Sequence, residues 1–243
     1  GGKGLIGLSI SEALAEMGAE VFIASPNSDN NEKNVKALRD IGYNVHGKPL
    51  DQSSELSVKS LIKEILIESG SPPSILFNCG VYRPMKKYFN DSTEKWDKSM
   101  EVNSRGLFVT CRLFANLMKV NGGGSIINVS SIYGLVAPDK KIYKGTELNT
   151  EPDYPYNKGG MIMFSKYLSA YLAEYNIRVN CIAPGGIYNK QPQNFIDKYT
   201  SKVPLNRMGS KEDLKGVSVF LASEASSYIT GAVIPVDGGL TVI

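Results

Sequence analysis

The chain has 243 residues, a net charge of +3 and a hydrophobic content of 42%, values that suit one soluble globular domain. Its basic residues are scattered, which argues against nucleic-acid binding. There is no apolar run of about 18 residues and no signal peptide, so we expect no membrane segment and a cytoplasmic protein. Three separated cysteines (Cys79, Cys111 and Cys181) and one histidine (His46) favour neither a disulfide nor a metal site.

Apolar spacing predicts helices and strands that alternate along the chain. Helices are expected over 5–17, 31–41, 54–69, 93–120, 154–175 and 211–221, and strands over 20–24, 44–49, 74–79, 125–130, 178–183 and 233–236. Apolar strands that alternate with helices form a parallel sheet covered on both faces. We therefore predict a doubly wound Rossmann fold, a three-layer α/β/α arrangement, as a single domain over residues 1–243.

Glycines open the first helix, where Gly1, Gly4 and Gly7 stand at three-residue intervals. Glycine lets a phosphate approach the backbone, and a helix N-terminus offers free N–H groups and partial positive charge. In a doubly wound sheet this is the expected dinucleotide site, and a plain glycine turn is the alternative. Lys3 either pairs with a phosphate or is a solvated charge. Because the turn normally follows a buried strand, we expect this sequence to lack the first strand of the sheet.

The end of the strand at 20–24 bears on the choice between NAD and NADP. An acidic residue there would bind the adenosine ribose diol of NAD and repel the extra phosphate of NADP. This chain has Ser25, Pro26 and Asn27, and its next carboxylate is Asp29. The neutral residues, with Lys3 nearby, favour NADP over NAD.

A tyrosine and a lysine, Tyr154 and Lys158, lie one helical turn apart. Free tyrosine, with a pKa of about 10, is a poor proton donor or acceptor at neutral pH, and a neighbouring cation favours the phenolate. The pair suits a general acid/base that interconverts an alcohol and a ketone. Such pairs are more often helix surface, and the significance of this one comes from Ser131 and the glycines upstream. Tyr156 faces another way.

Motifs along the whole chain resemble those of short-chain dehydrogenases/reductases. The matching blocks come in that family's order: Gly1-x-x-Gly4-x-x-Gly7, Asp51, Asn78-Cys79-Gly80, Asn103, Ser130-Ser131, Tyr154-x-x-x-Lys158, Pro184-Gly185 and Val236-Asp237-Gly238-Gly239. Each block alone is weak evidence for the family, but the whole set in this order is specific to it. The resemblance implies NAD(P)-dependent oxidoreduction of a small-molecule substrate.

Four residues match the catalytic positions of the family. The resemblance implies that Tyr154 is the acid/base and that Ser131 positions the substrate oxygen. It implies that Lys158 binds the nicotinamide ribose and activates the tyrosine, and that Asn103 holds a water linking Lys158 to solvent. Asn103 as a helix-internal amide and Ser131 as a cap at the strand end are the alternatives.

The resemblance also implies a set of cofactor-binding residues. They are Gly1, Lys3, Gly4, Leu5, Ile6, Gly7, Ser25, Asp51, Asn78, Gly80, Tyr154, Lys158, Pro184, Gly185 and Ile187. Asp51 would bind the adenine amino group, or else cap the following helix. Asn78 either lines the cofactor or is a structural residue of the sheet.

The segment between Ser131 and Tyr154 is longer than is usual in the family. We interpret residues 135–153 as a substrate-facing insertion, with a passive surface loop as the alternative. Ser131-Ile132-Tyr133-Gly134 and Ala137-Pro138 resemble oxidoreductases of bacterial flagellin-modification and nonulosonic-acid pathways. That local resemblance implies a polar, sugar-like substrate.

Two other functions remain open at this stage. The glycine spacing is that of sugar-nucleotide epimerases and dehydratases that retain NAD, and the fold also suits a non-catalytic nucleotide-sensing module. The family resemblance further implies a homodimer or homotetramer that pairs through the helices at 93–120 and 154–175.

Overall fold

The computed structural model describes residues 1–26 and 28–243, and all strands in these ranges are parallel. Strand β1 (Val21–Ser25) pairs with β2 (Val45–Pro49). A second sheet has the order β3 (Ile75–Asn78), β4 (Gly124–Val129), β5 (Ile177–Pro184) and β6 (Val233–Val236). Asn27, which the sequence analysis used in choosing between NAD and NADP, lies outside the described residues.

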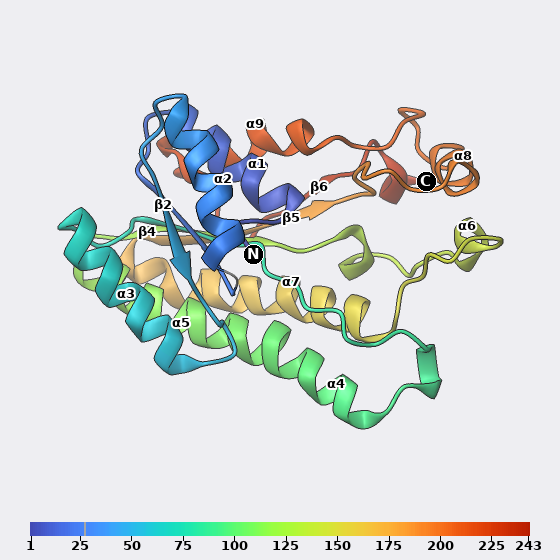
Figure 1. Ribbon diagram of the computed structural model, residues 1–243, viewed down its shortest axis with the longest axis horizontal. Coiled ribbons are helices and arrows are strands. Elements are labelled where there is room, and N and C mark those ends of the chain that lie inside the picture. The colour runs from blue at the N-terminus through green and yellow to red at the C-terminus, as the bar shows by residue number, and fades with distance from the viewer. Residues whose placement is uncertain (27) are drawn as a thin grey trace.

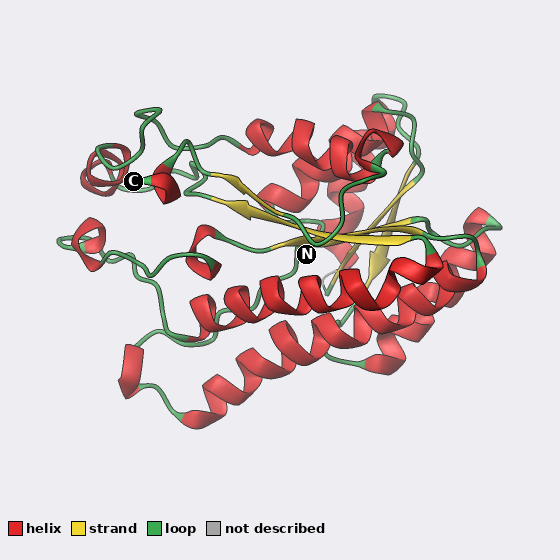
Figure 2. Cartoon of the chain, turned by 180° about the vertical axis from the view of Figure 1, so that it is seen from behind, coloured by secondary structure: helices red, strands yellow, loops and turns green. Residues whose placement is uncertain are grey.

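Helices cover both faces of the strands (Figures 1 and 2). One layer holds α1 (Leu5–Glu16), α2 (Ser28–Asp40) and α9 (Lys215–Ala222), and the other holds α3 (Glu55–Ser69), α5 (Gly106–Val120) and α7 (Asp153–Leu172). Both faces of β4 are buried, because Ile127 packs toward α9 while Ile126 packs toward α5 and α7. The predicted doubly wound α/β/α fold is therefore confirmed.

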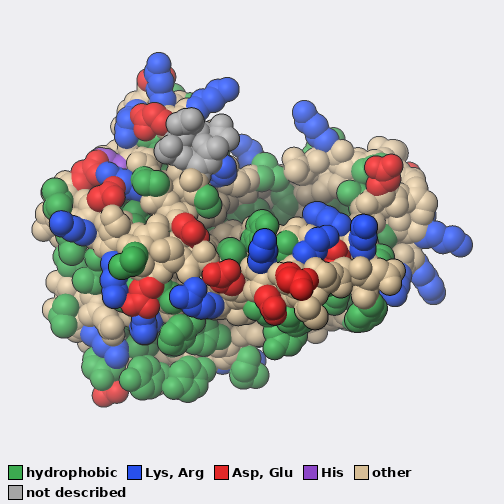
Figure 3. Space-filling model, turned by 60° about the horizontal axis from the view of Figure 1, so that its bottom comes forward, with side chains coloured by type: hydrophobic (Ala, Val, Ile, Leu, Met, Phe, Trp, Pro, Cys, Tyr) green, Lys and Arg blue, Asp and Glu red, His purple; other side chains and the backbone are tan. Residues whose placement is uncertain are grey.

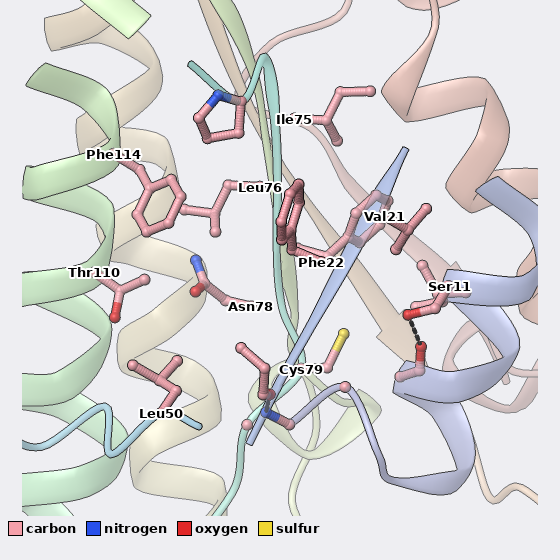
Figure 4. Close-up of a pocket in the computed structure, with 18 of the residues that line it drawn as sticks. Ser11, Val21, Phe22, Leu50, Ile75, Leu76, Asn78, Cys79, Thr110 and Phe114 are labelled. Atoms are coloured by element: carbon pink, nitrogen blue, oxygen red, sulfur yellow. Dashed lines mark hydrogen bonds between the residues drawn. The ribbon is translucent and has the colours of Figure 1, made fainter. Parts of the chain in front are cut away.

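The two sheets are separated by an apolar slot between β1 and β3 (Figure 4). The slot has a volume of about 170 Å³, and Phe22, Leu76 and Phe114 contribute to its lining. The same three side chains belong to the cluster that holds α3 and α5 against the strands. No strand fills this position among residues 1–26 and 28–243, as the sequence led us to expect.

The predicted helix at 93–120 is continuous but not uniform. Helix α4 (Thr93–Met100) runs through a π-helical turn, η2 (Glu101–Arg105), into α5. π-turns inside α-helices are frequent at functional sites, and this one contains Asn103. The sequence analysis predicted one uninterrupted helix here and gave no indication of the π-helical turn.

Two short helices lie in segments where the sequence analysis expected neither a helix nor a strand. They are α6 (Lys140–Tyr143) and α8 (Gln193–Thr200), which pack together beyond the carboxyl ends of β5 and β6 (Figure 1). Ile142, Phe195 and Tyr199 are buried in their common cluster. Short 3₁₀ helices occupy Tyr88–Asn90 (η1), Ile132–Gly134 (η3), Ala173–Tyr175 (η4), Lys211–Leu214 (η5), Glu224–Ser226 (η6) and Leu240–Val242 (η7).

Strand β4 and helix α7 are joined where the strand ends. The Ser130 hydroxyl donates to the carbonyl of Lys158 at 2.8 Å, and the Lys158 ammonium donates to the carbonyl of Val129 at 2.7 Å. Gly134 packs against the same carbonyl of Lys158, with no room for a side chain. This β4–α7 junction fixes how α7 is rotated about its axis and how far along its axis it lies relative to the end of β4.

Gly134→Ala is expected to destabilise the protein by about 1–3 kcal/mol, the usual range for overpacking. The added Cβ would lie 2.7 Å from the Lys158 carbonyl oxygen, so α7 would have to move. Urea unfolding measures the change.

Gly160→Ala in α7 is the matched control, since a Cβ there meets nothing within 4 Å. It should gain about 0.5–1 kcal/mol, because alanine is favoured over glycine inside a helix. Equal destabilisation by both substitutions would contradict the close packing at Gly134.

Candidate active site

A pocket of about 230 Å³ lies at the carboxyl end of β4, between α7 and the 135–153 insertion. Ser131, directly after β4, and Tyr154, the second residue of α7, both line it. The insertion contributes Tyr143, Leu148, Asn149 and Thr150. Carboxyl ends of parallel strands are where open α/β sheets bind ligands, so this is the candidate substrate pocket.

The structure brings together Ser131, Tyr154 and Lys158 as the sequence predicted. The Ser131 hydroxyl accepts from the Tyr133 backbone N–H at 3.1 Å, so this residue caps η3 while it lines the pocket. The Lys158 ammonium lies 5.8 Å from the centroid of the Tyr154 ring. Burial lowers the pKa of Lys158, and the nearby Tyr154 opposes that shift. Tyr156 is exposed and packs on Trp96, away from the pocket, also as predicted.

Asn103 is buried and its amide is bonded to protein atoms. Its Oδ1 accepts from the Tyr82 backbone N–H at 2.8 Å, and its Nδ2 donates to the Tyr82 carbonyl at 2.7 Å and to the Ser99 hydroxyl at 3.0 Å. These bonds hold the loop after β3 against the π-helical turn. The helix-internal amide was the alternative considered for this residue, and the water-holding role remains a prediction.

The sequence analysis missed a buried polar network that connects Asn103 to the start of α7. The Ser99 hydroxyl donates to Asp153 Oδ2 at 2.6 Å and accepts from Asn157 Nδ2 at 3.2 Å. Asp153 and Asn157 flank Tyr154 on α7, so the network fixes the helix turn that carries the tyrosine. Its members are far apart in the chain, and no spacing rule links them.

A second pocket, of about 420 Å³, is lined by the glycine turn and by the ends of β1, β2 and β3. A Cβ on Gly1 would collide with the backbone of Gly80, and one on Gly7 would collide with the carbonyl of Gly1. Helix α1 begins here with no acidic residue in its first turn and no side-chain cap. Close backbone and an open helix N-terminus fit the diphosphate of a dinucleotide, so these residues suit the expected cofactor.

Five of the other predicted cofactor residues line this pocket, and one of them, Ser25, has its hydroxyl bonded within the protein. Lys3, Gly4, Ser25, Asp51 and Gly80 line the pocket. The Ser25 hydroxyl, however, is buried and donates to Asn31 Oδ1, and Asn31 Nδ2 also donates to the carbonyl of Lys48 at 2.9 Å. The proton of this hydroxyl is thus used within the protein, and the cofactor contact of Ser25 stays a prediction.

Asp51 is exposed, and its Oδ1 accepts from the backbone N–H of Ser53 at 2.9 Å. Helix α3 is capped by Ser54, which accepts from the N–H of Ser57 at 3.3 Å, so the alternative reading of Asp51 as the helix cap is wrong. The adenine contact of Asp51 stays a prediction.

Asn78 has a structural contact, because its Nδ2 donates to Asn128 Oδ1 on β4 at 2.8 Å. In the first turn of α1, Leu5 is exposed, whereas Ile6 packs against the cluster around Ile127. Ile6 is therefore in part a core residue.

The residues after β5 approach the substrate pocket. Pro184 ends the strand, and Gly185 lines the pocket. Ile187 forms a parallel bridge with Gly209 and accepts at its carbonyl from Gln191 Nε2 at 2.9 Å. These contacts shape the wall where the nicotinamide contact of Ile187 is predicted.

Arg83 and Tyr199 also line the substrate pocket, and sequence reasoning missed both. The Tyr199 hydroxyl accepts from the backbone N–H of Gly186 at 2.5 Å. This hydrogen bond holds α8 against the turn Pro184-Gly185-Gly186. Arg83 comes from the loop after β3 and Tyr199 from α8, and only the folded chain shows that these segments meet at the pocket.

A family model described as Enoyl-(Acyl carrier protein) reductase matches residues 3–241. The chain belongs to the short-chain dehydrogenase/reductase family. The 3-oxoacyl-(acyl-carrier-protein) reductase of Chlamydia muridarum is 34% identical over 99% of this chain and 94% of the relative.

Solved structures agree with this family assignment. A short-chain dehydrogenase from Leptospira borgpetersenii with bound NAD⁺ is 33% identical, with a TM-score of 0.88 over 99% of this chain and 90% of that one. A gluconate 5-dehydrogenase from Burkholderia cenocepacia in complex with NADP and tartrate is 28% identical, with a TM-score of 0.89 over 100% of this chain and 93% of that one.

This short-chain dehydrogenase/reductase is accordingly an NAD(P)-dependent oxidoreductase acting on CH–OH groups. Among the helices of the described residues, none has the length and apolar content to cross a membrane. Within the same residues there is no group of three or more His, Cys, Asp or Glu side chains suited to a metal ion.

Lys158→Met is expected to change how stability depends on pH. Since burial lowers the pKa of Lys158, the folded protein releases this proton at a lower pH than the unfolded chain does. Between the two pKa values the unfolded chain binds more protons, so this group makes the free energy of unfolding rise with pH. In urea titrations from about pH 7 to the ordinary lysine pKa of about 10.4, the wild type should gain stability relative to Lys158→Met.

Lys166→Met, on the exposed face of α7, is the control. Wild-type and Lys158→Met curves that run parallel over the whole pH range would contradict the effect of burial on Lys158.

Proposed function

We propose that the enzyme interconverts a secondary alcohol and a ketone of a polar, sugar-like substrate, with Tyr154 as general acid/base. The observation that carries the proposal is the placement of two hydroxyl groups, those of Ser131 and Tyr154, on one pocket beside the 135–153 insertion. Lys158 stands one turn further along the same helix, close to the tyrosine ring.

In this proposal the bound nicotinamide supplies or accepts the hydride. Tyr154 gives its proton to the carbonyl oxygen in reduction and takes it back in oxidation. Ser131 donates a hydrogen bond to the same oxygen, so two hydroxyl donors meet the charge that develops there. Lys158 keeps a positive charge beside the tyrosine.

The lining of the pocket supports a polar substrate. Tyr133 and Tyr143 are bonded through their hydroxyls at 2.6 Å, and Thr150 donates to Tyr143 Oη at 2.8 Å. Burial and the bond to Tyr143 raise the pKa of Tyr133, so its hydroxyl stays protonated and serves only as a hydrogen-bonding group. A chain of hydroxyls at the pocket suits the hydroxyl groups of a sugar derivative.

The remaining proposals concern assembly. We propose that residues 1–243 act as one domain and that copies pair through α5 and α7. Both helices carry large exposed apolar side chains, among them Phe108, Met163, Tyr167 and Tyr171. Hydrophobic side chains also gather along the lower edge of the face in Figure 3. Contiguous exposed apolar surface marks interaction sites.

Tyr154→Phe should reduce turnover at least about a hundredfold, because positioned acid/base groups contribute about 10²–10⁴ in rate. The assay follows NAD(P)H absorbance with a panel of ketoses and keto acids. Tyr156→Phe, on the exposed face of the same helix turn, should keep wild-type turnover. Wild-type turnover in Tyr154→Phe would refute the role of the tyrosine.

We further propose that the enzyme prefers NADP and that Lys3 binds the extra phosphate, since Lys3 is the cation in the lining of the cofactor pocket. Lys3→Ala should weaken NADPH binding about tenfold, the usual scale of a charged hydrogen bond, and leave NADH binding unchanged. Nicotinamide fluorescence measures both affinities, with Lys36→Ala on the exposed side of α2 as control. Equal losses for the two cofactors would assign Lys3 to the shared diphosphate, and tighter NADH binding by the wild type would overturn the preference.

A further inference from the structure

We propose that Arg83 binds an anionic group of the substrate, a carboxylate or a phosphate, attached close to the reacting carbon. This inference rests on the proposed function, because it takes the pocket of Ser131 and Tyr154 as the place where the substrate reacts. It narrows the substrate from a polar sugar derivative to an acidic one.

Arg83 stands directly over the proposed acid/base. Its guanidinium carbon lies 4.6 Å from the centroid of the Tyr154 ring. Its Nη2 donates to the carbonyl of Asn149, in the insertion, at 3.1 Å. The stacking contact and the hydrogen bond hold the planar group at the pocket wall. A substrate whose oxygen meets Tyr154 therefore has the guanidinium as a neighbour.

Arg83 makes no ion pair with a carboxylate among the described residues, and the buried Glu151, two residues after Asn149, accepts instead from Asn149 Nδ2 at 2.8 Å and from the N–H of Tyr88 at 2.7 Å. Every other residue in the described lining of the substrate pocket is uncharged. Among the described ion pairs, Arg39, Arg105, Arg112 and Arg207 each contact a carboxylate, whereas Arg83 has no such contact. An arginine has five N–H donors in a fork that matches a carboxylate or phosphate, and here one bond goes to a backbone carbonyl.

The lysines of the insertion do not take this role. Lys140 lies over the Tyr88 ring, 5.5 Å from its centroid, and Asp139 is paired with Lys202. None of the three lysines of the insertion, Lys140, Lys141 and Lys144, lines the pocket in the described residues. The anion is therefore bound by Arg83, while the tyrosine and threonine hydroxyls of the pocket are left for the hydroxyl groups of the substrate.

Calorimetric titration of the full chain saturated with NADP⁺ tests the inference. The probes are L-tartrate, its neutral counterpart L-threitol, and inorganic phosphate. The wild type should bind tartrate or phosphate, and threitol at least about tenfold more weakly. Arg83→Gln, which keeps a donor for Asn149 but removes the charge, should weaken anion binding about 10–100-fold, as expected for hydrogen bonds to charged groups, and leave threitol unchanged.

Two further variants separate charge from packing. Arg83→Lys should recover part of the lost anion affinity, and Lys140→Ala should bind as the wild type does. The anion with the larger dependence on Arg83 identifies the substrate group as carboxylate or phosphate. Equal anion binding by the wild type and Arg83→Gln, or no binding of either anion by the wild type, would overturn the inference. An equal loss of threitol binding in Arg83→Gln would also overturn the inference, because it would show that Arg83 acts by packing and not by its charge.

Tyr154→Phe distinguishes this inference from the proposed function. It should keep Arg83-dependent anion binding while it loses turnover. Anion binding that depends on Arg83, together with full turnover in Tyr154→Phe, would refute the acid/base role and leave the anion site standing. Tyr154-dependent ketone reduction with no Arg83-dependent binding would refute the anion site alone.

Discussion

The end of β4 and the middle of α7 are joined by two hydrogen bonds, from Ser130 to the carbonyl of Lys158 and from Lys158 to the carbonyl of Val129. Gly134 adds a close backbone contact at the same carbonyl. Because α7 carries Tyr154 one turn before Lys158, this junction also sets the position of the tyrosine relative to Ser131. The bonds are buried, where protein hydrogen bonds are strongest and an unmade one is costly, so the proposed catalytic groups stand on a rigid support.

Around that support, two pockets lie at the carboxyl ends of the parallel strands, and we propose that one binds the cofactor and the other the substrate. The proposed cofactor pocket includes Gly1, Gly4 and Gly80, and close backbone of this kind suits a phosphate that must come close to N–H groups. The substrate pocket is made of side chains from the loop after β3, the insertion and α8. Loops can vary without disturbing the sheet, and Arg83 lies in such a loop, between β3 and η1.

Buried polar groups link the two halves of the site. Asn103 holds the backbone of Tyr82 in the loop that leads to Arg83, and Ser99 joins Asn103 to Asp153 beside Tyr154. Buried polar groups are generally hydrogen-bonded, although Asp153 Oδ1, the second oxygen of this carboxylate, has no partner among the described residues. The network therefore couples the position of the Arg83 loop to the start of α7, and a change at one member is felt at the others.

The sequence by itself determined the alternating strands and helices, the glycine turn and the Tyr154–Lys158 pair, because each depends on periodicity or spacing within a few residues. Only the tertiary structure decided that the Ser25 hydroxyl is bonded to Asn31 and that Arg83 lies over Tyr154. Those contacts depend on how loops and strand ends meet in space, which local sequence patterns do not encode.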